Sequence, residues 1–355
     1  MPLKTPRLLL QACLVPSLMA CAYGQEAPDA QKLFFGPDPI EITVEPAAEL
    51  WFEVRSRAAS TEDVPEEDPL AGAIGATRAI RNILSDPAGW FLLDAHMLCA
   101  SLPGGFAAEM DKELRIPPKY RQAGIGPAQP PLLSMELARE LDKAAPRWME
   151  EVWPDRQKAL ESTRAALAEI LTNEAQHMMI AELENLVRLP APEGSFPVRL
   201  VTTIPDRDEV VLGVRKQQVT AFVSTQDREV PALADVVIHE VLHVSNSRPF
   251  FPASIFSVLV NKMAVLRVRG KKATDAIHLS FYMLSGELLR RYALPEHVDQ
   301  GETSGFYGRA PSLHQQLKPL FDQFMSGEVA TGSFTEQYAA ITAAWYSAGG
   351  EFQEQ

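Results

Sequence analysis

Two histidines and a glutamate stand close together in the chain, at His239, Glu240 and His243. Residues at positions i and i+4 share one face of a helix, so both imidazoles can point at a single spot. Two histidines would supply two of the three protein ligands of a catalytic zinc site. Glu240 is turned by about 100° from His239, so its carboxylate can reach a water molecule on the metal without ligating the metal. The spacing therefore predicts a metal site with its own proton acceptor.

The chemistry that these residues favour is hydrolysis. Zinc lowers the pKa of a bound water molecule to about 7, so hydroxide is available near neutral pH. Glu240 would take the proton of that water during attack on a carbonyl and return a proton to the leaving amine. We therefore predict a zinc-dependent peptidase with Zn2+ as cofactor and a peptide or protein as substrate.

The surroundings of the motif favour a buried helix. The stretch 236–244 is apolar apart from the three motif residues, and Asp235 precedes it. Pro231 suits the first turn of a helix, and Pro249 and Pro252 end the helical pattern. Polar side chains on a buried helix are costly unless something binds them, and a metal ion would do so. So short a pattern also arises by chance, and the apolar context is what favours the metal site.

The motif resembles that of the zincin metallopeptidases, in which His239, Glu240 and His243 match the first ligand, the general base and the second ligand. The resemblance implies a predominantly helical α+β fold with a zincin-like catalytic lobe. In such a lobe a small β-sheet lies over the helix of the motif, and its edge strand pairs with an extended substrate.

Two branches of the zincins do not fit. The metzincin extension requires a glycine and a third histidine at positions occupied here by Asn246 and Pro249. The thermolysin-like branch takes a glutamate soon after the motif, whereas the stretch 244–274 contains no Asp or Glu. The third ligand is therefore expected further along the chain.

The predicted helix 274–292 contains the candidates for the third ligand. We prefer Glu287, which would make the site gluzincin-like, because its leucine neighbours suggest a buried carboxylate that needs a cation. Arg290 or Arg291 could supply that cation instead. His278 is the alternative ligand. Glu287 follows His278 by nine residues, or about 900° of helix, so the two side chains point in opposite directions and cannot both ligate.

A glycine-rich stretch at 301–311 contains Tyr307. Hydrolysis of a peptide needs a hydrogen-bond donor to the tetrahedral oxyanion, and Tyr307 or His278 could provide it. The competing interpretation is that Tyr307 is an aromatic residue packed in a turn.

Composition and the N-terminus indicate which partners and which cellular location the protein has. Its 355 residues carry a formal net charge of −13, which argues against a nucleic acid as partner. Lys4 and Arg7 precede the apolar run 8–20, which is too short to span a bilayer, so we predict a signal peptide at 1–24 and a periplasmic or secreted protein. Alternatively, Leu18 to Cys21 resembles a lipobox, and Cys21 would carry a lipid anchor. No other segment suggests a membrane span.

Pattern and composition divide the mature chain into three parts. Residues 25–70 form an N-terminal segment ending in an acidic linker, 71–190 a helical region, and 191–355 the catalytic region. Short strands are predicted at 40–45, 197–203, 210–214 and 219–223, the last two as a hairpin. Helices are predicted at 47–59, 71–84, 90–102, 134–145, 147–188, 252–268, 274–292, 313–325 and 334–348.

A second functional hypothesis is a non-catalytic exported protein that retains a zincin scaffold for binding or assembly. The presence of Glu240 argues against it, because a binding role needs no proton acceptor.

Overall fold

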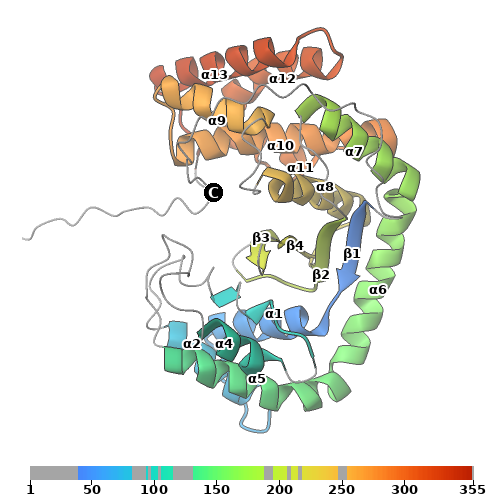
Figure 1. The fold of residues 1–355 in the computed structure, drawn as a ribbon, viewed down its shortest axis with the longest axis vertical. Helices are drawn as coiled ribbons and strands as arrows, with labels where there is room; N and C mark the ends of the chain where they lie inside the picture. The colour runs from blue at the N-terminus through green and yellow to red at the C-terminus, as the bar shows by residue number, and fades with distance from the viewer. Residues whose placement is uncertain are drawn as a thin grey trace, which may run out of the picture.

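The computed structural model describes residues 39–81, 93–94, 97–102, 105–114, 131–187, 195–205, 209–214, 218–246 and 254–353. The predicted signal peptide and Cys21 lie outside these residues, as do residues 90–92 and 95–96 of the predicted helix 90–102. The fold is predominantly helical with one small sheet, which confirms the predicted α+β class (Figure 1). Among the described residues, no helix combines the length and apolar character needed to cross a bilayer.

The sheet has four strands in the order β1-β2-β4-β3. Neighbours β1, β2 and β4 are parallel, and β3 runs antiparallel to β4 at one edge. Because Val214 pairs with Gln218 across a short link, β3 and β4 form the predicted hairpin. The strands are β1 (Ile40–Val44), β2 (Phe196–Val201), β3 (Glu209–Val214) and β4 (Gln218–Ser224).

Helices surround the sheet in two groups (Figure 1). The first group lies on one side and comprises α1 (Pro46–Ala59), α2 (Ala71–Arg81), α4 (Phe106–Leu114) and α5 (Pro131–Glu151). Helix α6 (Trp153–Ile170) runs past the sheet and leads to α7 (Asn173–Val187) in the second group. The rest of that group is α8 (Val230–Asn246), α9 (Ile255–Val265), α10 (Lys271–Tyr292), α11 (Gln300–Thr303), the 3-10 turn η2 (Tyr307–Arg309), α12 (Pro311–Met325) and α13 (Thr331–Ser347).

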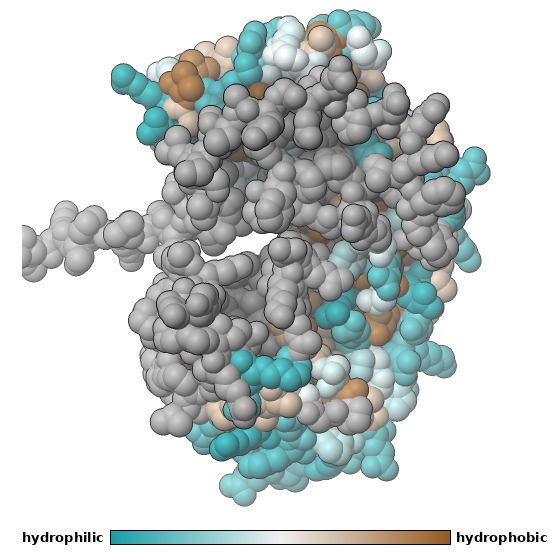
Figure 2. Space-filling view, viewed as in Figure 1, coloured by the Kyte–Doolittle hydropathy of each residue, from teal (hydrophilic) through white to brown (hydrophobic). Residues whose placement is uncertain are grey.

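The segment 39–70 contributes to the core. Strand β1 pairs with β2 along its whole length, and Trp51 and Phe52 of α1 are fully buried. Trp148 and Trp153 are also buried and lie against each other. The outer face of α6 is polar, and Figure 2 shows hydrophilic residues at the margin of the molecule where this helix lies.

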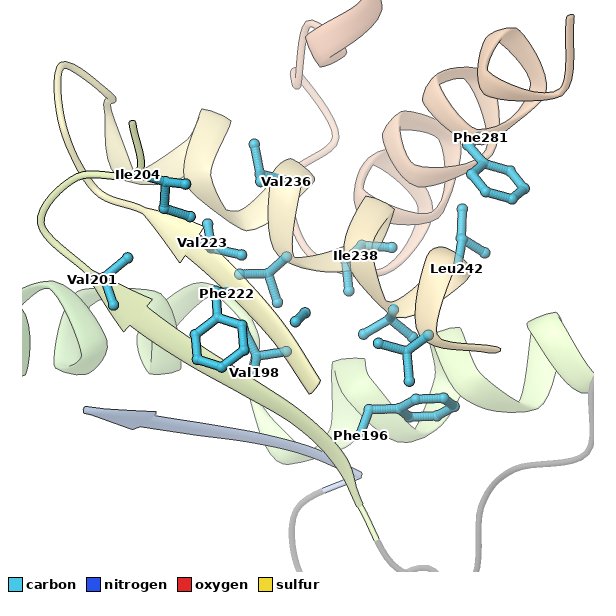
Figure 3. Close-up of a cluster of buried hydrophobic side chains, with 14 of the residues drawn as sticks. Phe196, Val198, Val201, Ile204, Phe222, Val223, Val236, Ile238, Leu242 and Phe281 are labelled. Atoms are coloured by element: carbon cyan, nitrogen blue, oxygen red, sulfur yellow. The ribbon is translucent and has the colours of Figure 1, made fainter. Parts of the chain in front are cut away.

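Helix α8 occupies the centre of the second group. It packs on β2, β3 and β4 on one side and on α6 and α10 on the others, which explains why it is apolar all round. Figure 3 shows one buried cluster that includes Val198 and Val223 of the strands and Val236 and Ile238 of α8. Each fully buried aliphatic side chain of this kind contributes about 1.5–3 kcal/mol. The sheet therefore fixes the helix that carries the histidine motif.

Candidate metal centre

Helices α8 and α10 bring three imidazoles together. The Nε2 atom of His243 lies 3.1 Å from Nε2 of His239, one turn earlier on α8. It lies 3.0 Å from Nε2 of His278, which comes from α10. The three ligand atoms all lie within 4.8 Å of one another. These residues are close enough to hold a metal ion.

The donor set fits a cation better than hydrogen bonds. A ring nitrogen carries at most one hydrogen, yet Nε2 of His243 faces two other ring nitrogens at hydrogen-bonding distance. Zinc–nitrogen bonds of 2.0–2.1 Å at tetrahedral angles would place the nitrogens about 3.3 Å apart. The two short separations are close to that value, so the arrangement around Nε2 of His243 suits a bound cation.

The environment keeps the imidazoles neutral. Burial, with repulsion from the other histidines, holds the pKa of His239 and of His243 well below the usual value. Burial lowers the pKa of His278 to about 4, although the charge of Asp275 opposes this shift. Neutral imidazole is the form that binds metal ions, so the site is prepared for a ligand set of three histidines.

Aromatic rings enclose the three histidines. The Tyr282 ring lies 4.4 Å from that of His239, and the Phe281 ring lies 4.8 Å from that of His243. Because Nδ1 of His239 is buried without a hydrogen-bond partner among the described residues, ring packing orients this side chain. Phe281 and Tyr282 were not predicted as site residues, although they follow His278 by three and four residues and so share its side of α10.

Glu240 lies beside the two histidines on α8. It is 2% exposed, so its carboxylate belongs to the buried part of the helix. Its position is turned by about 100° from His239 and about 60° from His243, which makes it a neighbour of both ligands along the helix surface.

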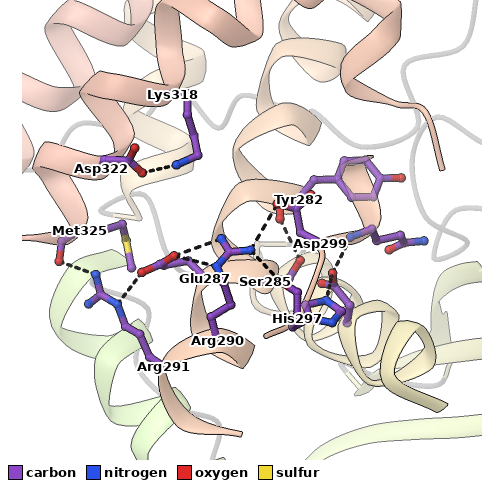
Figure 4. A network of polar contacts seen from close by, with 12 residues as sticks. Tyr282, Ser285, Glu287, Arg290, Arg291, His297, Asp299, Lys318, Asp322 and Met325 are labelled. Atoms are coloured by element: carbon purple, nitrogen blue, oxygen red, sulfur yellow. Dashed lines mark hydrogen bonds and ion pairs between the residues drawn. The ribbon is translucent and has the colours of Figure 1, made fainter. Parts of the chain in front are cut away.

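The structure does not bring Glu287, the preferred third ligand, to the histidines. Its carboxylate forms ion pairs with Arg290 at 3.0 Å and with Arg291 at 2.8 Å (Figure 4). Burial would raise the pKa of Glu287, but the hydrogen bonds from Arg291 and Arg290 lower it. The carboxylate already has its cations, at i+3 and i+4 on the same helix. His278, the alternative, is the side chain of α10 that lies with the two histidines of α8, so the arrangement fits three histidines better than the predicted gluzincin-like set.

Tyr307 belongs to a second polar cluster. Its ring stacks on His314 at 3.8 Å, and burial together with the Asp299 carboxylate raises the pKa of its hydroxyl. Among the described residues, no hydrogen bond or ring contact joins Tyr307 to the three histidines. In the same region Asp235 of α8 accepts hydrogen bonds from Nε2 of His297 at 2.8 Å and from the Gln300 amide at 2.6 Å. This cluster anchors α8 to the chain that follows α10.

Comparisons with models of protein families, with curated proteins and with solved structures found no match for the chain.

Proposed function

We propose that this protein is a zinc-dependent peptidase of the zincin type, with His239, His243 and His278 holding the metal. The observation that carries the proposal is the convergence of three Nε2 atoms from α8 and α10 beside Glu240. Structural zinc sites are closed by four protein ligands, whereas catalytic sites use three and keep one position open. Among the described residues, the group contains three such ligands.

Each protein residue has a distinct part in this proposal. A bound zinc ion would polarise the substrate carbonyl and make water a better nucleophile. Glu240 takes a proton from the attacking water at its carboxylate and passes a proton to the amine that leaves. Phe281 and Tyr282 hold the imidazole rings in place and limit the access of bulk water to the ligands.

The sheet supports a peptide as substrate. Strand β3 lies at the edge, and its free side pairs with no other strand among the residues that the structure describes. An extended peptide can add to such an edge through main-chain hydrogen bonds, which bind it with little regard to side chains. The zincin-like lobe is also supported by the order of elements, because the hairpin β3–β4 leads directly into the metal helix α8. Export through the N-terminal segment remains a prediction from the sequence.

The test combines metal analysis with one substitution. Wild-type protein is expected to contain about one zinc per chain by mass spectrometry and to cleave members of a broad peptide library. Glu240→Gln should keep the zinc and lose activity by about 10²–10⁴-fold, because it removes only the proton acceptor. Wild-type activity in Glu240→Gln would contradict the role of Glu240. A zinc-loaded wild type that cleaves no peptide would favour the non-catalytic binding protein.

A further inference from the structure

The chain turns back on itself after α13. Gly349 has a φ of +85°, a left-handed conformation that favours glycine. The next amide, of Gly350, donates to the Trp345 carbonyl at 2.9 Å. A Cβ atom on Gly350 would lie 2.4 Å from the Trp345 ring, so only glycine lets the main chain pass so close. The two glycines direct the segment 351–353 toward η2.

The segment 351–353 is held like a bound peptide. Arg309 contacts the main chain of Gln353 twice: its carbonyl accepts from the Gln353 amide at 3.0 Å, and its Nε donates to the Gln353 carbonyl at 2.9 Å. The ring of Phe352 lies between two other rings, 5.9 Å from Phe306 and 5.6 Å from Trp345. Main-chain bonds together with one aromatic anchor are a general mode of recognising an extended peptide.

This holding site adjoins the candidate metal centre. The Phe306 ring, which contacts Phe352 on one side, lies 6.3 Å from the ring of His278 and 4.6 Å from that of Tyr282. The Arg309 guanidinium lies 5.1 Å from the Phe306 ring, and its charge adds to burial in lowering the pKa of His278. One aromatic side chain therefore joins the segment to the histidines.

We propose that Phe306, Arg309 and Trp345 form a binding site for an extended peptide with an aromatic residue, and that segment 351–353 fills this site as an internal ligand. This inference rests on the proposed function, because a peptidase would place its peptide substrate in this site. Two hydrogen bonds and two ring contacts hold the segment, so a better peptide can displace it. A tethered ligand has an effective concentration on the order of millimolar, so an added peptide must compete with it.

Binding in trans tests the site without any need for catalysis. The probe is a fluorescein-labelled peptide with the sequence Ala-Gly-Gly-Glu-Phe-Gln of residues 348–353, added to Glu240→Gln protein and followed by fluorescence anisotropy. When Phe352→Ala is combined with Glu240→Gln, the protein should bind the labelled peptide at least tenfold more tightly, because the internal ligand loses its aromatic anchor. Gln353→Pro should act in the same direction, because proline lacks the N–H that Arg309 accepts. Glu351→Gln, an exposed substitution in the same segment, should change nothing.

The outcomes separate this inference from the proposed function. Circular dichroism establishes that each variant is folded, and a probe with alanine in place of phenylalanine should not bind. Unchanged affinity in both folded variants, Phe352→Ala and Gln353→Pro, would overturn the binding site and leave the peptidase proposal intact. Gained binding without hydrolysis in Phe352→Ala protein that retains Glu240 would support the site and contradict the peptidase. Gained binding together with faster cleavage of aromatic peptides would support both.

Discussion

Which side chain of α10 reaches the two histidines of α8 depends on the immediate neighbours of His278 and Glu287 along the helix. Glu287 has arginines at i+3 and i+4, where a helix brings opposite charges together, and its carboxylate is satisfied there. His278 instead has Phe281 at i+3 and Tyr282 at i+4, which offer no charge and leave its Nε2 facing His243. The difference between Glu287 and His278 is visible in the sequence, because the spacing of Arg290 and Arg291 makes them possible partners of Glu287.

We predict that two substitutions on α10 have opposite consequences for the metal. His278→Ala removes one of three ligands and should weaken zinc binding at least 100-fold, in line with the cost of disturbing a metal site. Glu287→Gln should keep about one zinc per chain, because Glu287 binds Arg290 and Arg291 rather than the metal. Competition with a chromogenic chelator measures both affinities. Loss of zinc in Glu287→Gln, with zinc retained in His278→Ala, would instead identify Glu287 as the third ligand.

At the scale of elements, a glycine decides how the chain after α10 packs. Gly286 lies on α10, and a Cβ atom added there would be 2.2 Å from Cβ of Asp299 and 3.3 Å from its Cα. A glycine at this position of a helix lets a neighbouring segment approach closely. The structure shows that the neighbour is the segment leading into α11, which also binds Asp235 of α8.

We predict that Gly286→Ala destabilises the protein, although alanine is the better helix former. The gain in helix propensity is about 1 kcal/mol, whereas forcing a methyl group into a filled space costs about 1–3 kcal/mol. The contact includes backbone as well as Cβ, which favours the upper end of the steric cost, so we expect a net destabilisation of up to about 2 kcal/mol. Gly75→Ala on α2 is the matched control, because nothing lies within 4 Å of its added Cβ. Chemical denaturation should show the control stabilised by about 0.5–1 kcal/mol.

Local sequence patterns predicted the helices and strands better than they predicted which of them pack or pair together. The hairpin β3–β4 followed from alternating apolar residues around the polar link 215–218. The break between α5 and α6 was missed, although Pro154 suits the first turn of a new helix. The pairing of β1 with β2 could not be predicted, because Ile40 and its partner Phe196 are far apart in sequence and no local pattern specifies long-range pairing. The same limit hid the meeting of His278 with α8.

At the scale of the whole molecule, the sheet and a few polar contacts join the two helical groups. Glu49 of α1 is buried, and its carboxylate accepts the Thr202 amide, which follows β2, at 2.7 Å. Burial raises the pKa of Glu49, while the hydrogen bond to Thr202 opposes the shift. A carboxyl group is therefore placed where its charge is costly, at a contact between the first helical group and the sheet.

We predict that Glu49→Gln changes how stability depends on pH. Because its pKa is raised on folding, Glu49 binds more protons in the folded than in the unfolded state above pH 4.5, so its contribution falls as pH rises toward the folded pKa. Glutamine keeps an acceptor for the Thr202 amide and does not ionise, so the variant does not lose stability from this position as pH rises. The melting temperature of the variant relative to wild type should therefore increase from pH 4.5 to pH 7. An unchanged difference would show that folding does not shift the pKa of Glu49, and a decreasing one that folding lowers this pKa; either result would contradict the prediction.

Metal binding should stabilise the whole fold although its ligands come from two helices. A ligand that binds only the folded protein adds about 4 kcal/mol when its free concentration is 1,000 times its Kd. The residues before α6 contribute β1 to the sheet on which α8 packs, so unfolding of one helical group would expose the core of the other.

We therefore expect one calorimetric transition, lowered by several degrees when a chelator removes the metal. His278→Ala should melt near the chelated wild type and should not respond to chelator. A shift confined to one of two transitions would show that the helical groups unfold separately. An identical melting curve with and without chelator, in protein shown to contain zinc beforehand, would place that zinc outside the three histidines.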